Sequence, residues 1–171
     1  TNMPVLVLPH PQSGRGASHI LENTDVVMAM TDQLAGDDWL VSYALSFTQK
    51  KGNILLTHIE DGVTFDRFIR TIGKIPSIDT DTAEKAIMEQ LLDEPSDYIE
   101  SCRATIDKSG FDVGIESIVR VGHHLKEYKT LIEEKEVDIL IINTKDQHQM
   151  AMHGTAYAIA VEFRHIPLLM L

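Results

Sequence analysis

Short apolar runs alternate along this chain with stretches whose apolar residues recur at helical spacing, from Asp25 to the C-terminal residue. This alternation is typical of crossover units that build a parallel sheet with helices on both faces. The fourth run consists almost entirely of Ile, Leu and Val, as expected for a central strand buried on both faces. We therefore predict five strands, at Val26–Met30, Ile54–Ile59, Ile115–Val121, Val137–Ile142 and Pro167–Leu171.

Helical periodicity fills most of the gaps between these strands. Asp37 and Asp38 are N-cap candidates ahead of apolar residues that cover one helix face, and Gly52 is expected to end that helix. Two further helices are predicted at Leu125–Lys135 and Gly154–Arg164.

The stretch between the second and third strands is less regular. Residues 60–80 predict a short amphipathic turn or helix over the sheet edge. Asp81 and Glu84 then have capping-box spacing and predict a helix start. Because proline removes an interior hydrogen bond, Pro95 predicts two helices or one kinked helix before Gly110.

The N-terminal part has a different pattern. Residues 3–9 form an apolar run bounded by prolines, which residues 166–171 repeat, and residues 9–24 have the composition of a linker. Residues 3–9 are either the last strand of a preceding, related domain or an ordinary edge strand or expression remnant. We assign residues 1–24 to this strand and linker and residues 25–171 to the main domain, and we expect the chain to be excised from a longer protein.

Composition narrows the class of partner. The chain has 171 residues, 43% of them hydrophobic, and no apolar run near the length of about 20 residues that a membrane-spanning helix needs. Acidic residues outnumber basic ones by 26 to 15, which disfavours nucleic acid and anionic lipid as partners. A single cysteine, Cys102, and the absence of a signal-peptide pattern predict a cytoplasmic location.

Three segments are expected to meet at one edge of the sheet, because parallel sheets bind ligands at the carboxyl ends of their strands. These segments are Thr31-Asp32, Gly122-His123-His124, and the loop that leads from the fourth strand to Gly154-Thr155. The helix start at Gly154 offers free backbone amides that suit an anion.

From residue 25 onward the sequence resembles the universal stress protein domain. The resemblance rests on the order and spacing of Met30-Thr31-Asp32, Leu56-Thr57-His58-Ile59, Val121-Gly122, the fourth strand, Gly154-Thr155 and Ile166-Pro167. It implies an open α/β fold with strand order 3-2-1-4-5, like that of adenine nucleotide alpha hydrolases. It also implies a homodimer or a tandem pseudo-dimer through the last strand.

Many members of that family bind ATP through an aspartate after the first strand and a loop of the form G-x2-G-x9-G-[S/T] after the fourth. Asp32 and Gly154-Thr155 match this pattern, but Asn143 and Asp146 replace the first two glycines, and only seven residues separate Asp146 from Gly154. The nucleotide contacts that the resemblance implies for this chain are Thr31, Asp32, Thr57, Gly122, Ile142, Asn143, Lys145, Gly154, Thr155 and Ala156.

The Asp146 carboxylate decides which nucleotide is expected. A carboxylate about 4 Å from a phosphate repels it by a few kcal/mol in a partly screened site, comparable with the gain from a helix N-terminus. Lys145 offsets part of this repulsion. We therefore predict weak or absent ATP binding and regard AMP or another small adenine nucleotide as the ligand that the loop still allows.

Several of these residues also have purely structural interpretations. Asp32 can be a solvated loop acid, Thr155 can simply cap the last helix, and His58 fits a hydrogen-bonded structural histidine. Adjacent histidines on an extended segment point in opposite directions, so we expect no metal site from His123, His124, His148 and His153.

The expected function is that of a non-catalytic signalling or stress-response module, since no P-loop or G-x-S-x-G elbow is present. One alternative is a cytosolic regulatory domain fused to another protein, such as a membrane transporter. The other is a stress protein that binds ATP or hydrolyses it slowly.

Overall fold

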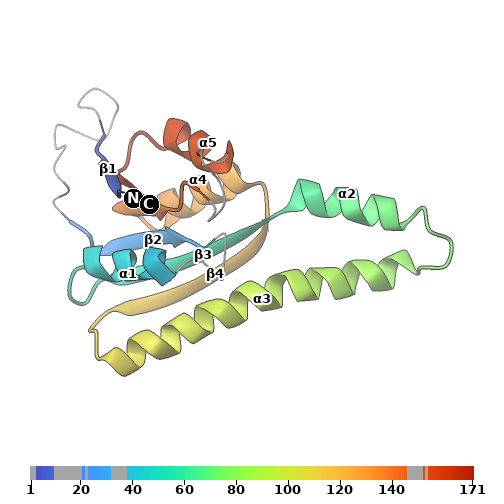
Figure 1. Ribbon diagram of the computed structural model, residues 1–171, viewed down its shortest axis with the longest axis horizontal. Helices are drawn as coiled ribbons and strands as arrows, with labels where there is room; N and C mark the ends of the chain where they lie inside the picture. The colour runs from blue at the N-terminus through green and yellow to red at the C-terminus, as the bar shows by residue number, and fades with distance from the viewer. Residues whose placement is uncertain (1–2, 10–20, 22, 32–37, 146–151, 153) are drawn as a thin grey trace.

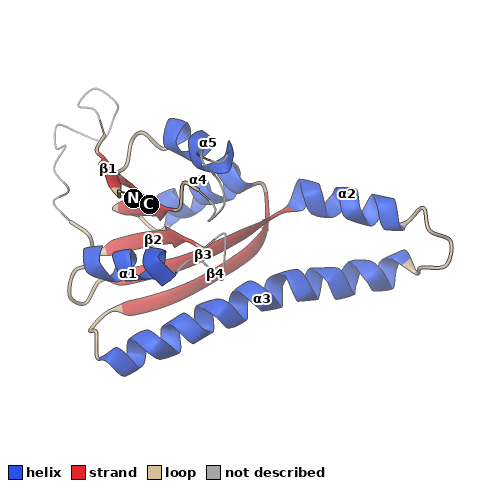
Figure 2. Ribbon diagram, in the orientation of Figure 1, coloured by secondary structure: helices blue, strands red, loops and turns tan. Residues whose placement is uncertain are grey.

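The computed structural model describes residues 3–9, 21, 23–31, 38–145, 152 and 154–171. One six-stranded sheet forms the centre of an α/β body, with strand order β1-β6-β5-β2-β3-β4 (Figures 1 and 2). The strands are β1 (Val5–Val7), β2 (Val26–Met30), β3 (Asn53–Asp61), β4 (Gly114–Gly122), β5 (Ile139–Ile142) and β6 (Leu168–Met170). The helices are α1 (Asp38–Phe47), α2 (Gly62–Ile72), α3 (Thr80–Ser109), α4 (His124–Glu134) and α5 (Gly154–Glu162).

The two central strands, β2 and β5, are buried between two helical layers. Side chains alternate across a strand, so Val27 and Ala29 pack with α1 and α3, whereas Met28 and Met30 pack with α4 and α5. All four side chains are at most 2% exposed. The uninterrupted apolar sequence of these strands follows from burial on both faces.

The expected order 3-2-1-4-5 is confirmed for the five parallel strands β4-β3-β2-β5-β6. The expected number of strands was wrong, because β1 adds a sixth strand antiparallel to β6. This pairing covers the edge of β6, the last strand, through which the family resemblance implied a dimer or tandem pseudo-dimer. Most of the predicted linker, by contrast, lies outside the described residues.

The prediction that Gly52 ends the first helix was wrong. Helix α1 ends at Phe47, and Gly52 follows a tight turn directly before β3. A Cβ atom at Gly52 would lie 2.8 Å from the carbonyl oxygen of Asp25 and 2.9 Å from that of Gln49. Glycine is therefore required there because two backbone segments approach closely.

Residues 62–109 form two antiparallel helices, α2 and α3, that project beyond the sheet (Figure 1). The amphipathic helix expected within residues 60–80 is present as α2, but it extends the line of β3 away from the body. The predicted cap of the next helix was wrong. Asp79 is the N-cap of α3, and its carboxylate accepts hydrogen bonds from the Asp81 N–H at 3.2 Å and the Thr82 hydroxyl at 2.6 Å.

Pro95 lies inside one continuous helix of 30 residues, so the expectation of two separate helices was wrong. The ring of Pro95 is buried, and the stripe continues with the buried side chains of Ile99 and Ile106. The hydroxyl of Ser96 donates to the carbonyl of Leu92 at 2.6 Å. Packing of this face on the sheet therefore outweighs the hydrogen bond that proline removes.

Candidate ligand cleft at the carboxyl edge of the sheet

Thr31 and Thr57 lie side by side where β2 and β3 reach the carboxyl edge. The Thr31 N–H donates to the Thr57 carbonyl at 2.9 Å, and the Thr31 hydroxyl lies 3.3 Å from the same oxygen. The Thr57 hydroxyl lies 3.4 Å from the carbonyl of Leu55. Both residues are fully buried. The described contacts of both hydroxyls are thus to the backbone, and they fix the direction in which the chain leaves β2.

His58 fixes the same backbone from the other side. Its Nδ1 lies 2.7 Å from the carbonyl oxygen of Thr31, and its Nε2 lies 3.2 Å from a carboxylate oxygen of Glu60. A carbonyl oxygen only accepts, so Nδ1 carries the hydrogen of the first bond. The expected hydrogen-bonded, structural histidine is therefore confirmed, and this histidine orients the residue that precedes Asp32.

Gly122 lies further along the strand direction than Thr31 and Thr57. Thr57 pairs with Ile118, and the β3–β4 ladder continues four residues further, to the pair Asp61 and Gly122. At the usual rise of a strand this places Gly122 about 13 Å beyond Thr57 along the ladder. Gly122 and the two threonines thus share the carboxyl side of the sheet without meeting at one point.

Gly122 lies against the first part of α4. A Cβ atom on Gly122 would lie 2.7 Å from Cγ of Glu127, so a side chain here would displace the flexible Glu127 side chain. Nε2 of His124 lies 2.6 Å from the carbonyl of Ile59 and holds the start of α4 against β3. Gly122 and His124 therefore serve the junction between the β3–β4 ladder and α4.

Asp61 caps α2 at the end of β3. The Thr64 hydroxyl donates to its carboxylate at 2.7 Å and lowers the pKa of Asp61. Partial burial opposes this shift, whereas the Val63 N–H, which donates at 3.0 Å, and the nearby imidazole of His124 lower the pKa further. The carboxylate form of Asp61 is thus favoured by the fold.

The second residue of the loop after β5, Thr144, is one that the sequence patterns did not single out. Thr144 donates to the carbonyl of Leu171 from its N–H at 3.0 Å and from its hydroxyl at 2.6 Å. These two bonds tie the start of the loop to the end of β6. A threonine after a buried strand is too common a pattern to have revealed this role.

The other predicted contacts of this loop differ in exposure. Ile142 is buried, Asn143 is half-buried and Lys145 is exposed. Several residues for which the sequence made predictions fall outside the described residues: Asp32, Asp37, Asp146, His148 and His153.

Helix α5 begins at Gly154, which is exposed, and continues with half-buried Thr155 and buried Ala156. A Cβ atom on Gly154 would meet no atom within 4 Å. Packing therefore does not require glycine here. The N-terminus of a helix favours an anion through its dipole.

Within the described residues no group of three or more His, Cys, Asp or Glu side chains could hold a metal ion. Across the same part of the chain, no helix is both long and apolar enough to cross a membrane.

No family model matches the chain, and no curated protein matches its sequence. Solved structures do match its fold. The hypothetical protein MJ0577 aligns with a TM-score of 0.68 and 16% identity over 86% of this chain and 95% of that protein. The universal stress protein UspA from Lactobacillus plantarum aligns with a TM-score of 0.55 and 11% identity, over 87% of this chain and 98% of that protein. A protein of the universal stress protein family from Burkholderia pseudomallei aligns with a TM-score of 0.53 and 13% identity, over 86% of this chain and 96% of that protein.

These likenesses define an α/β protein with a mostly parallel sheet. The fold is that of the universal stress proteins, as the sequence resemblance implied. Sequence identities between 11% and 16% establish the fold alone, since fold and function separate easily.

Proposed function

We propose that this chain is a non-catalytic signalling or stress-response module of the universal stress protein type. The observation that carries the proposal is the fold, shared with two universal stress proteins over 86% and 87% of this chain. The contacts of Thr31, Thr57 and His58 support it. These side chains hydrogen-bond to the backbone at the strand ends, a role in positioning the cleft rather than in chemistry.

The proposed ligand is a small adenine nucleotide such as AMP, bound in preference to ATP. Both ligands would place an anion near the N-terminus of α5. In the sequence pattern Asp146 replaces a glycine of the family's ATP loop, so its carboxylate is expected to disfavour the longer, more highly charged phosphate chain of ATP more than that of AMP.

Isothermal titration with AMP and ATP tests this preference. We expect no micromolar binding of ATP to the native chain. Asp146→Asn, which keeps the size of the side chain and removes its charge, should tighten ATP binding about tenfold or more and change AMP binding less. Asp112→Asn is the matched control, since Asp112 is exposed at the opposite end of the strands, before β4.

Micromolar binding of ATP to the native chain would contradict the proposed ligand preference, as would an Asp146→Asn variant that binds like the native chain. Release of phosphate from ATP above a buffer blank, lost in Asp32→Ala, would instead favour a slow hydrolase.

We also propose that β1 belongs to a second unit of the same kind, which makes a tandem pseudo-dimer. Aligning Pro4 with Pro167 makes Leu6 equivalent to Leu169. In the sheet, Leu6 pairs with Leu169 itself, and Val5 pairs with Met170, the equivalent of Val7. Two like strands paired antiparallel about a central equivalent pair have the local two-fold symmetry of an isologous contact.

The exposure of β1 supports this assignment. Val5, Leu6, Val7 and Leu8 are between 41% and 52% exposed, although all four are apolar. A strand of this composition normally has a core on its own face to cover it. The complete coding sequence tests the assignment. It should contain a second α/β unit that ends at residues 3–9, whereas membrane-spanning segments at that place would favour a transporter domain.

A further inference from the structure

The projecting pair of helices, α2 and α3, carries apolar surface that the sheet does not cover. None of residues 80–94, the N-terminal half of α3, is buried, although this half contains Met88 and Leu92. On α2, Val63 and Phe68 are 62% and 57% exposed. This end of the molecule lies away from the two helical layers that enclose the core (Figure 1).

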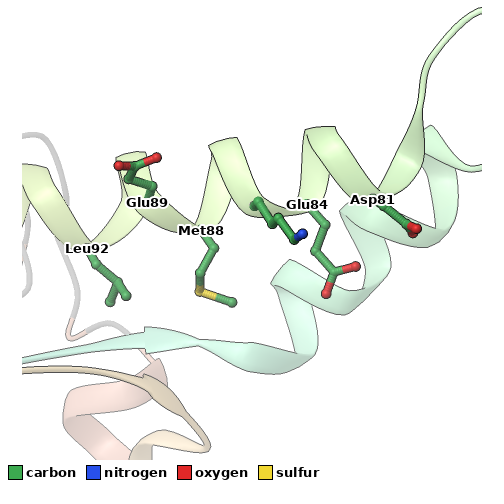
Figure 3. Close-up of a pocket in the computed structure, with 6 residues that line it drawn as sticks. Asp81, Glu84, Met88, Glu89 and Leu92 are labelled. Carbon is green, nitrogen blue, oxygen red and sulfur yellow. The ribbon is translucent and has the colours of Figure 1, made fainter.

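A groove runs along one side of α3 in this region. It is an open groove with a volume of about 480 Å³, lined by Asp81, Glu84, Lys85, Met88, Glu89 and Leu92. Figure 3 shows Met88 and Leu92 pointing to the same side of α3 as Glu84. The four-residue spacing of Glu84, Met88 and Leu92 follows the helix repeat, so apolar and acidic side chains form one continuous stripe.

Charge narrows the kind of molecule that fits this groove. Helix α3 has eight acidic and three basic residues, a net charge of −5, within a chain of net charge −11. Among the described residues, the only ion pair of an α3 acid joins Glu100 to Arg103, so Asp81, Glu84 and Glu89 form no ion pair, and these three acids outnumber the single lysine, Lys85, that lines the groove. A second copy of this chain would bring the same negative charge to the contact, so electrostatic repulsion disfavours it. The negative charge of the groove favours a basic partner instead.

We propose that this groove, the α3 groove, binds a basic amphipathic helix of a partner protein. Apolar side chains of that helix would rest on Met88 and Leu92, and its Lys or Arg residues would face Asp81, Glu84 and Glu89. A helix that lays one apolar face into such a groove is a common mode of peptide recognition. The proposal does not depend on nucleotide binding, because the α3 groove uses none of the residues of the cleft.

Fluorescence anisotropy with two synthetic helical peptides tests the proposal at about 0.15 M salt. The first peptide has leucines along one face and lysines elsewhere, and the second has the same lysines but glutamine in place of every leucine. The native chain should bind the first peptide and bind the second at least about tenfold more weakly, because only the first can fill the groove.

Two doubly substituted chains then locate the site. Glu84→Lys with Glu89→Lys should weaken binding of the leucine peptide about tenfold or more. Glu133→Lys with Glu134→Lys is the matched control, since both residues are exposed on α4 and the change in net charge is identical. Circular dichroism establishes folding, and the milder pair Glu84→Gln with Glu89→Gln, expected to weaken binding to a smaller degree, serves if the lysine pair fails to fold.

Four outcomes would overturn the proposal. They are no binding of the leucine peptide by the native chain, equal binding of both peptides, equal weakening by the α4 and α3 substitutions, and self-association of the chain that Glu84→Lys with Glu89→Lys abolishes. The last outcome would identify a second copy as the occupant of the groove.

Discussion

Single polar contacts fix the backbone at the end of β3. His58 holds the carbonyl of Thr31, and Asp61 caps α2 four residues after Thr57. The first contact fixes the backbone at the end of β2, and the second caps the start of the projecting helix α2. Both can be tested by stability measurements on single variants, since each removes one defined hydrogen-bonding group.

Replacing Asp61 with Ala should lower the free energy of unfolding by about 1 kcal/mol at neutral pH, the usual cost of losing an N-cap. The pKa of Asp61 is lowered by the fold below its ordinary value of 3.8, so its stabilisation is present above that value. It is lost as the pH falls through the lower, folded-state pKa. The difference between native chain and variant in urea denaturation should therefore vanish in strong acid.

Thr64→Val gives the control for this prediction, because it removes the hydroxyl that contributes most to lowering the pKa of Asp61. A difference between native chain and Asp61→Ala that is the same at all pH values would show that the carboxylate charge is irrelevant.

Replacing His58 with Phe should lower the free energy of unfolding by about 1–3 kcal/mol, since a ring without a donor leaves the buried Thr31 carbonyl without this bond. Glu60→Gln keeps a hydrogen-bonding oxygen near Nε2 and should cost less. Chemical denaturation of the three chains measures both effects. Equal stability of the native chain and His58→Phe would contradict the structural role.

At the scale of elements, α3 shows how packing overrides local preference. Proline inside a helix costs about 3 kcal/mol relative to alanine, yet Pro95 lies within 30 helical residues. The same helix contributes Ile99 and Ile106 to the core on one face of the sheet. Its N-terminal half, in contrast, lies beyond the sheet and forms the α3 groove.

Pro95→Ala should raise the free energy of unfolding by about 0.5–1 kcal/mol. The gain in helix propensity of about 3 kcal/mol is opposed by loss of two buried methylene groups, about 1.6 kcal/mol, and by greater freedom of the unfolded chain. Pro95→Gly should be about 1 kcal/mol less stable than the alanine variant. Urea denaturation that ranks Pro95→Ala below the native chain would mean that ring packing dominates.

At the scale of the whole molecule, β1 covers the edge of β6 by pairing with it. The two strands pair over three residues, in a register centred on Leu6 and Leu169. An unpaired apolar edge strand is a template for association with another chain, and natural sheets commonly cover such an edge. We therefore expect assembly through β6 to be governed by whichever strand occupies this edge.

Deleting residues 1–9 should convert the chain to a homodimer in which two copies of β6 pair antiparallel. The full chain should remain monomeric, because β1 already occupies this edge. Sedimentation equilibrium of both chains measures the difference. Identical masses for the two chains would contradict the role assigned to β1.

The strand order was implied by the resemblance to the universal stress protein domain. Most strand boundaries could be predicted to within one residue from the hydrophobic pattern, since runs such as Ile139–Ile142 are apolar on both faces, as is typical of central strands. The end of β3 could not be predicted in this way. Residues 60 and 61 are polar and look like a loop, but pairing with β4 keeps them in the sheet. Thr144 was missed for a similar reason, because its partner, Leu171, lies 27 positions further along the chain.

The sequence by itself determined the fold class and the acidic character of α3, because hydrophobic periodicity and charge are local properties of the chain, and its resemblance to the universal stress protein domain implied the order of the five parallel strands. Only the tertiary structure decided that β1 closes the edge of β6, that Gly122 lies beyond the two threonines, and that α3 projects with an open groove. Each of these features depends on contacts between residues that are far apart in the sequence. The packing of the whole chain sets the register of such contacts.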